Sequence, residues 1–365
     1  MAKKSRLKTV LMSLLIIIAV IVVLAFAFRD TALVYPLFSK LYSEKLEVEN
    51  TGKFQSDTVS TSCLVGNRLV YYDTDSVCRD DGKKVKLKIT EPNMESAGSC
   101  FVVFSKIDNK AVVFSGMKKS YTVSDENGIQ FAKVGENGSS VVVTNEPGYR
   151  GKVTVYDPDG EKAFRASFGE KYVIDAAISE NGKKIALCLF DTKGDEFESI
   201  VQFYDISQKE PYAEEVYTDT VLTNVKLFSD SGAIAVGDKK AVGFSSSGEA
   251  EWQYSYDGAV LQSFSLNSED YIALCLKKGK QSIVCIDSSG SNYEYEYSGS
   301  NIKMIDLNDD AVMAVTPRSV IFVTTHGYEI AEKEISVDIK NAFMLDEDRT
   351  GIIVHSFGYE TLLAR

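Results

Sequence analysis

The sequence has few of the residues on which most catalytic and metal sites depend. Its 365 residues include only two histidines (His326 and His355), six cysteines and one tryptophan. It also has no HExxH, paired CxxC, GxSxG or GxxxxGK[ST] motif. The sequence therefore lacks the motifs of a zinc hydrolase, of the usual serine hydrolase site and of a phosphate-binding nucleotide loop. We predict no catalytic residue, no metal site and no cofactor.

Other scarcities limit the class of protein. Six prolines and 25 glycines exclude collagen-like and proline-rich repeats. Six cysteines are too few for a scaffold built on disulfides, so a packed core must supply the stability. Acidic residues outnumber basic ones by 52 to 40, which gives a net charge of −12 and argues against a nucleic-acid partner.

One long hydrophobic run lies near the start of the chain. In residues 10–28 only Ser13 is polar, and a helix of that length spans roughly 28 Å, close to the ~30 Å hydrocarbon core of a bilayer. Four basic residues precede the run: Lys3, Lys4, Arg6 and Lys8. We therefore predict a cytoplasmic basic tail (1–9), a single transmembrane helix (10–28) and a juxtamembrane stalk (29–44), with the rest of the chain outside the cell membrane.

A cleaved signal peptide is the alternative for this segment, because Ala25-Phe26-Ala27 imitates a cleavage site. Cleaved peptides have apolar cores of ~7–15 residues, shorter than this run, so a retained anchor is favoured.

The remainder of the chain repeats one pattern. Short apolar runs alternate with Gly, Asp, Asn and Ser turns, which predicts an all-β protein. Eight copies of one apolar strand occur, at 67–73, 100–106, 140–146, 184–191, 233–238, 271–277, 311–317 and 351–357. A second strand ends in a glycine turn, and from Gly82 to Gly327 these turns recur on average about every 41 residues. This period is typical of the four-stranded blades of a β-propeller.

The sequence thus predicts an eight-bladed propeller over 45–365, with seven blades as the alternative because the module near 93–125 is short. The last module lacks an outermost strand, and residues 45–49 are a spare strand ahead of the first module. Pairing of these two segments closes the ring and removes an exposed sheet edge.

The motifs carry a family resemblance. Glycine turns followed by an apolar residue four places on, as in Gly248 to Trp252, resemble the blade motif of quinoprotein-like propellers. The turns at 179–182 and 229–232 resemble those of translocation-type propellers. Anchor and ring together resemble an uncharacterised bacterial family of membrane-anchored propellers, the 5711 group of domains of unknown function. The resemblance implies an architecture and no activity.

The turns predict a disc with two unlike faces. Turns between first and second strands hold ten acidic and four basic residues, whereas turns between second and third strands hold eleven basic and nine acidic residues. The second set includes two long insertions, 145–152 and 191–199, which we expect to be partner-binding loops. The candidate binding residues of this set are Tyr149, Arg150, Lys193, Phe197, Lys239, Lys240, Lys278 and Arg318.

We therefore expect a membrane-tethered module that binds a protein or a cell-envelope polymer and is not an enzyme. The alternative is an envelope enzyme that acts on a glycan, for which two facing carboxylates at the channel mouth are required. A sensor that signals through the helix needs a second membrane protein, because the cytoplasmic tail is short.

Overall fold

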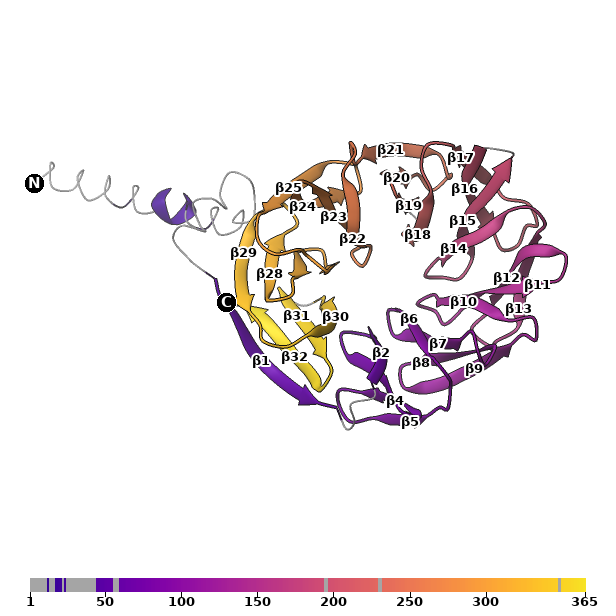
Figure 1. Cartoon of the computed structure of the whole chain (residues 1–365), viewed down its shortest axis with the longest axis horizontal. Helices are drawn as coiled ribbons and strands as arrows, with labels where there is room; N and C mark the ends of the chain where they lie inside the picture. Colours follow the sequence, from indigo (N-terminus) through magenta and orange to yellow (C-terminus); the bar gives the residue numbers. More distant parts are fainter. Residues whose placement is uncertain are drawn as a thin grey trace, which may run out of the picture.

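Residues 46–365 form a ring of eight antiparallel sheets of four strands each, as Figure 1 shows down the ring axis. This computed structural model describes residues 12, 17–21, 23, 44–54, 59–193, 196–228, 232–346 and 349–365. The eight-bladed propeller predicted from the repeats is confirmed. The seven-bladed alternative is wrong, because the short module near 93–125 forms a complete blade.

Seven blades take their strands consecutively from the channel outward. Blade 1 consists of β2 (Val59–Leu64), β3 (Leu69–Asp73), β4 (Ser76–Arg79) and β5 (Lys84–Lys86). Blade 2 consists of β6 (Asn93–Ala97), β7 (Cys100–Ser105), β8 (Lys110–Ser115) and β9 (Lys118–Ser124). Blade 3 consists of β10 (Ile129–Val134), β11 (Ser140–Glu146), β12 (Tyr149–Tyr156) and β13 (Lys162–Phe168). Blade 4 consists of β14 (Tyr172–Ile178), β15 (Lys184–Lys193), β16 (Glu196–Asp205) and β17 (Ala213–Tyr217).

The second half of the ring continues this order. Blade 5 consists of β18 (Leu222–Phe228), β19 (Gly232–Gly237), β20 (Lys240–Phe244) and β21 (Ala250–Ser255). Blade 6 consists of β22 (Val260–Ser265), β23 (Tyr271–Lys278), β24 (Lys280–Asp287) and β25 (Asn292–Tyr297). Blade 7 consists of β26 (Met304–Leu307), β27 (Ala311–Val315), β28 (Ser319–Thr324) and β29 (Glu329–Glu334). Blade 8 consists of β30 (Ile339–Met344), β31 (Thr350–His355), β32 (Gly358–Ala364) and β1 (Leu46–Lys53).

Burial explains the composition of the strands. The second strand of a blade packs against both neighbouring blades, so β19 and β27 are buried at every position and consist of small and apolar residues. The outermost strands alternate instead, as in β25, where tyrosines are half-buried and glutamates are exposed. Tyr295 and Tyr297 pack against the core shared with blade 7, as their alternation predicts.

The recurrent glycine turns serve the packing between blades. Gly290, with φ of +85°, lies in the turn before β25, and a Cβ added there would be 2.7 Å from Cγ of Trp252 on blade 5. The indole Nε1 of Trp252 also donates a hydrogen bond to the Ser288 carbonyl, at 3.1 Å. An outermost strand can thus press directly on the next blade's turn because that turn has no side chain.

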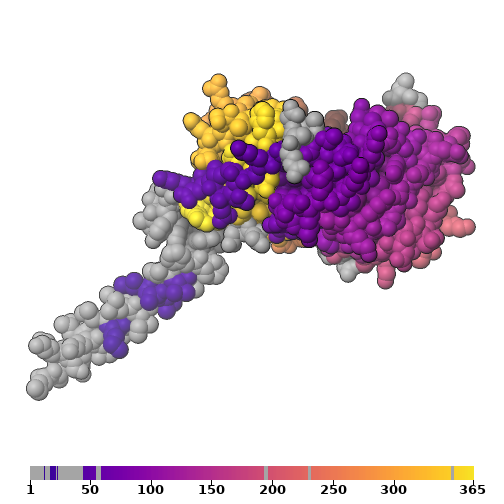
Figure 2. All heavy atoms as spheres, turned by 90° about the horizontal axis from the view of Figure 1, so that it is seen from below, coloured from indigo at the N-terminus to yellow at the C-terminus, as the bar shows by residue number. Residues whose placement is uncertain are grey.

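Both ends of the chain build the last blade. The sequence places the closing strand at 45–49; in the structure it is β1, which extends to Lys53 and pairs antiparallel with β32 over seven residue pairs. Figure 2 shows β1 in indigo against the yellow last blade. Beyond the strand, Phe54 packs on Tyr71 of blade 1, with ring centroids 4.6 Å apart. The first residues of the ring therefore hold its last blade against its first.

A buried guanidinium fixes the point where the chain joins the ring. Arg349, whose side chain is 5% exposed, makes two hydrogen bonds of 2.9 Å to the carboxylate of Glu44 and a third, also 2.9 Å, to Asp310 of blade 7. Both bonds to Glu44 come from Nη1 and the bond to Asp310 comes from Nε, and all three are charge-assisted hydrogen bonds. Glu44 is thereby tied to two blades just before β1 begins.

The predicted membrane anchor lies almost entirely outside the described residues. Met12, residues 17–21 and Val23 are helical, and the apolar side chains among them are exposed. The predicted basic tail (1–9) and residues 29–43 of the stalk are outside the described part. Where the structure describes the chain, none of its helices has both the length and the apolar character needed to cross a bilayer.

The hairpins of blades 3, 4 and 6 are tighter than the sequence suggests. The insertions at 145–152 and 191–199 mostly lengthen the hairpins β11–β12 and β15–β16 and do not form long loops, because their residues continue the antiparallel pairing. In β23–β24 a tight turn at Gly279 pairs Cys275 with Ile283 and not with Cys285. All six cysteines are free and buried.

We predict that Arg349→Met lowers the free energy of unfolding by about 1–3 kcal/mol, because it leaves two carboxylates without their cation. Chemical denaturation measures the change. Arg365→Met is the matched control: Arg365 pairs with Glu49 at 3.1 Å, but its side chain is 61% exposed, so the loss should be below about 0.5 kcal/mol. Equal effects of the two substitutions would contradict the role of Arg349 at the junction.

Candidate binding faces and central channel

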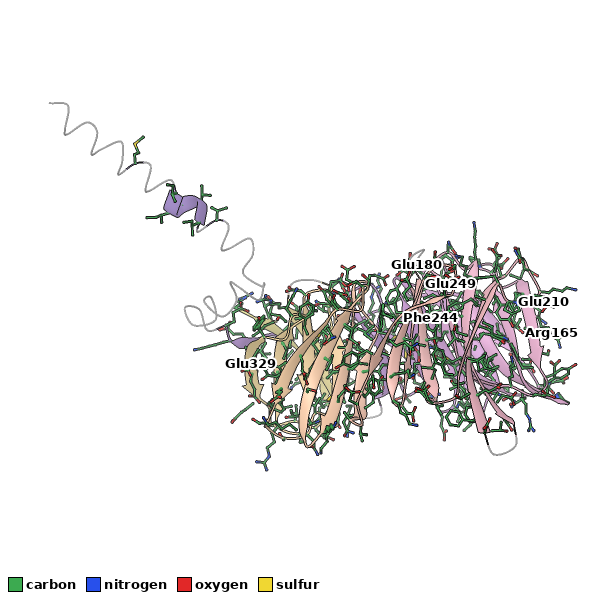
Figure 3. The ribbon with its side chains drawn as sticks, turned by 90° about the horizontal axis from the view of Figure 1, so that it is seen from above. Arg165, Glu180, Glu210, Phe244, Glu249 and Glu329 are labelled. Carbon is green, nitrogen blue, oxygen red and sulfur yellow. The ribbon has the colours of Figure 1, made fainter. Side chains whose placement is uncertain are left out.

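The disc has two faces that carry its loops. We name the strands of each blade A to D from the channel outward. The BC face consists of the turns between B and C strands and the connections from each D strand to the next blade. The AB face consists of the A–B and C–D turns, an arrangement that follows from the strand order. Figure 3 shows the disc edge-on, with Glu180 and Glu249 of the AB face near its upper border.

All eight residues predicted to bind a partner belong to turns of the BC face. Tyr149 and Arg150 begin β12, Lys193 ends β15, Phe197 lies in β16, Lys239 and Lys240 lie at the β19–β20 turn, Lys278 ends β23, and Arg318 precedes β28. These positions follow an arc over blades 3 to 7 and do not meet in one pocket. Their role in binding stays a prediction.

Several of these cations have partners that the sequence pattern did not indicate. The guanidinium of Arg150 lies 4.9 Å from the ring centroid of Tyr172 on the next blade. The ammonium of Lys240 lies 2.6 Å from an Asp219 carboxylate oxygen, and that of Lys278 donates to the Asp257 carbonyl at 2.6 Å. All three partners lie in or next to the connections between blades. Counting only the B–C turns therefore missed them.

These partners change the predicted charge of the BC face. Asp219 and Asp125 both belong to connections between blades, and each neutralises one lysine of a B–C turn, Lys240 and Lys152 respectively. The expected basic excess is thus largely compensated. The AB face, in contrast, gains further carboxylates from its C–D turns: Asp81, Asp157, Asp159, Asp205 and Asp287. The two faces differ because one is acidic, not because the other is basic.

Exposed apolar side chains distinguish the faces more clearly. Outside the N-terminal helix, nine large apolar residues of the described chain are exposed. Six lie on the BC face or in the channel just below it: Ile107, Tyr149, Tyr172, Ile174, Val260 and Phe357. Phe357 is 72% exposed and Val260 is 60% exposed. From the sequence only Tyr149 was chosen. Phe357 was placed in the apolar strand 351–357, whereas β31 ends at His355 and leaves Phe357 in the B–C turn.

The inner strands enclose a channel along the ring axis. Two cavities of about 540 and 530 Å³ lie in it and share six wall residues: Glu95, Lys133, Leu266, Asn267, Asn341 and Phe343. Four acidic residues line the larger cavity where it opens on the AB face: Glu136, Glu180, Glu269 and Asp346. They come from four different blades, and Glu269 pairs with Lys226 at 3.0 Å. The glycan-hydrolase alternative needs two of these carboxylates on opposite sides of a bound sugar, roughly 5–9.5 Å apart, and it stays a prediction.

Two buried carboxylates of the inner strands tie blades together. Asp175 binds the Lys133 ammonium of blade 3, at 2.6 Å, and the Val225 amide of blade 5, at 2.9 Å. Asp306 accepts hydrogen bonds from Ser265 and Asn267 of blade 6, at 2.7 and 2.6 Å, and from the Met344 amide of blade 8, at 2.8 Å. Each carboxylate therefore links its own blade to both neighbours.

Burial dominates the acid–base properties of the interior. It raises the pKa of Asp306 to about 6 although four donors, among them the Leu307 amide, favour the charged form. It raises the pKa of the Cys285 thiol to about 12 and that of Cys63 to about 12, so these thiols stay protonated and unreactive.

The two histidines lie apart from each other: His326 lies in a C–D turn beside Tyr293, and His355 ends β31. In the described chain no group of three or more His, Cys, Asp or Glu side chains is placed to hold a metal ion.

Comparisons with known proteins agree with this architecture. The sequence profile of a family of unknown function, DUF5711, matches residues 40–362. No curated protein sequence matches the chain. Among solved structures, BamB from Moraxella catarrhalis is similar, with a TM-score of 0.56, 11% identity, and coverage of 87% of this chain and 99% of BamB.

Two further structures are also similar. One is the C-terminal WD40 domain of Sif2, with a TM-score of 0.63, 10% identity and coverage of 88% and 99%. The other is the Cps50 (Swd1) β-propeller domain of Myceliophteria thermophila, with a TM-score of 0.53, 10% identity and coverage of 87% and 99%. At these identities the likeness shows the fold alone.

We predict that Asp306 makes stability depend on pH between about 4 and about 6. Its pKa is raised from 3.8 to about 6 on folding, so the folded chain holds the proton more tightly. The resulting stabilisation is complete below about pH 4 and is lost, by up to about 3 kcal/mol, as pH rises to about 6. Unfolding free energies measured across this range for the protein and for Asp306→Asn test this. In Asp306→Asn the unfolding free energy should fall less steeply with pH over this range. The same pH dependence in both proteins would contradict the prediction.

Proposed function

The chain belongs to the DUF5711 family of unknown function, and we propose that it is a membrane-tethered scaffold that binds a protein partner outside the cytoplasm. The β-propeller fold, which it shares with BamB and WD40 domains, is compatible with a protein-binding module. In this proposal the chain is not an enzyme and binds neither a nucleic acid nor a catalytic cofactor.

The exposed apolar residues of the BC face are the observation that carries the proposal. Exposed aromatic side chains beside an arginine are typical of protein interfaces. Tyr149 is 50% exposed and adjoins Arg150, whose guanidinium covers Tyr172. These residues belong to the β11–β12 hairpin and to β14, so a rigid scaffold presents them. A cell-envelope polymer is the competing partner, and the experiment below separates the two.

The tether and the BC face lie on opposite sides of the disc. β1 begins at the AB face, where Lys45 and Arg365 exchange two backbone hydrogen bonds of 2.7 and 3.0 Å. A predicted anchor at 10–28, joined through 29–44, therefore attaches at the acidic face. This attachment directs the BC face away from the membrane, and repulsion between the acidic AB face and anionic lipid head groups keeps the disc from lying flat on the bilayer.

We predict that a partner contacts the BC face. A photo-crosslinking residue placed at position 149, 239 or 318 should capture the same protein in intact cells, with a yield several-fold above that from AB-face positions 136, 180 and 346. The physical reason is that the first set lies on the face that carries most of the exposed apolar side chains of the described ring. Capture at equal yield from both faces contradicts the proposal. Capture of a glycopolymer instead of a protein identifies the competing class of partner.

We also predict that the ring lies outside the cytoplasmic membrane. Because all six native cysteines are buried, Ser336→Cys in the exposed connection before β30 adds a single accessible thiol. A membrane-impermeant maleimide should label it in intact cells. The control Ser5→Cys lies in the basic tail and should be labelled only after lysis. Labelling of the Ser5 variant in intact cells, or of the Ser336 variant only after lysis, contradicts the proposed topology.

A further inference from the structure

The central channel contains a carboxylate without a partner. Glu95 lies on β6, the inner strand of blade 2, and its side chain is exposed to the channel, where it lines both cavities. Within the described part of the chain, no hydrogen-bond donor and no cationic group lies within bonding distance of its carboxylate. Protein surrounds much of this group, and burial raises the pKa of Glu95, with a smaller opposing effect of Lys133.

The neighbouring lysines do not compensate this charge. The ammonium of Lys133 lies 2.6 and 2.8 Å from the two carboxylate oxygens of Asp175. The ammonium of Lys226, nearer the AB face, binds the Ser268 carbonyl and Glu269, both at 3.0 Å. Each lysine is thus matched by its own carboxylate, and Glu95 leaves the middle of the channel negative. A negative charge that faces the channel with no cation bound to it attracts a cationic ligand.

Aromatic and aliphatic side chains complete the wall around this carboxylate. The cavity of about 530 Å³ is lined by Phe131 of blade 3, Phe264 of blade 6 and Phe343 of blade 8, together with Ile174 and Leu266. Phe131 and Lys133 are two positions apart on β10, so they project to the same side of the strand. Lys133, Asp175 and Asp306 also line this cavity, but each of them is hydrogen-bonded to other groups of the protein. A cavity of this size, with aromatic walls and a carboxylate that no other group binds, has the form of a small-molecule site.

We propose that the channel binds a small organic cation, an ammonium group joined to an apolar body, with the ammonium on Glu95 and the body among the three phenylalanines. Carboxylate and aromatic faces are the two protein groups that attract such a cation. The acidic mouth of the channel on the AB face, lined by Glu136, Glu180 and Asp346 among others, steers cations inward. This site is independent of the protein-binding role proposed for the BC face.

The test uses the full-length protein and three probes of similar shape. 2-Phenylethylammonium carries the cation, 3-phenylpropan-1-ol is neutral, and 3-phenylpropionate is an anion. Titration calorimetry and ligand-detected NMR should show that the cation binds at least about tenfold more tightly than either of the others. Glu95→Gln should lower the affinity for the cation at least about tenfold. Glu294→Gln, an exposed glutamate on the outermost strand β25, should leave it unchanged.

A second substitution tests the apolar wall separately. Phe343→Leu keeps an apolar side chain but removes one aromatic face, and it should weaken cation binding several-fold. Equal affinity of the cation and the anion for the wild-type protein overturns the proposal, as does unchanged cation binding in Glu95→Gln. Absence of cation binding at concentrations up to about 10 mM, a weak affinity even for a small ligand, overturns it as well. The comparison of the three probes on the wild-type protein decides the question even if Glu95→Gln does not fold.

Discussion

Closure of the ring is the constraint on which the other features depend. A ring of eight sheets has its interior strands buried on both sides only if no blade is left with an open flank. The chain meets this condition by placing β1 beside β32, so that the eighth blade is built from both ends of the folded region. The channel, the two faces and the contacts between consecutive blades exist because this pairing joins the last blade to the first.

Contacts between neighbouring blades use a small set of devices repeated around the ring. Buried carboxylates on inner strands bind the backbone or side chains of both adjacent blades, as Asp175 and Asp306 do. Toward the outside, a ring such as that of Trp252 packs on a glycine turn of the following blade. The inner contacts fix the width of the channel, and the outer contacts fix the tilt of each sheet. The cavities in the channel are therefore set by the spacing of blades and not by any single loop.

The fold could be predicted from the sequence because its information is local and repeated. Eight apolar strands and their glycine turns recur at the period of a blade, and each repeat confirms the others. Contacts across blades are different, since no spacing in the chain indicates that Lys240 meets Asp219 or that Arg150 covers Tyr172. The number of charged residues in the B–C turns could be counted from the sequence. The sequence did not show that carboxylates in the connections between blades neutralise some of these lysines.

The candidate site shows the same limit more sharply. Tyr149 and Arg150 could be chosen because they flank a turn, whereas Val260 and Tyr172 begin inner strands that read simply as apolar. Glu95 is one glutamate among 52 acidic residues, and only the convergence of eight inner strands shows that it faces a cavity. Phe131, Phe264 and Phe343 likewise belong to different repeats, so their proximity depends on ring geometry alone.

The junction at Glu44 has a mechanical consequence. A tension applied to the chain before β1, along the axis of that strand, runs parallel to β1 and to its partner β32. The seven residue pairs that join these strands then resist together, in shear, and do not open one after another as in peeling. Through its hydrogen bonds to Glu44 and Asp310, Arg349 transmits part of this force to blades 7 and 8 before the force reaches the β1–β32 pairing. A pull in this direction is thus spread over blades 7 and 8 and over the whole length of the β1–β32 pairing.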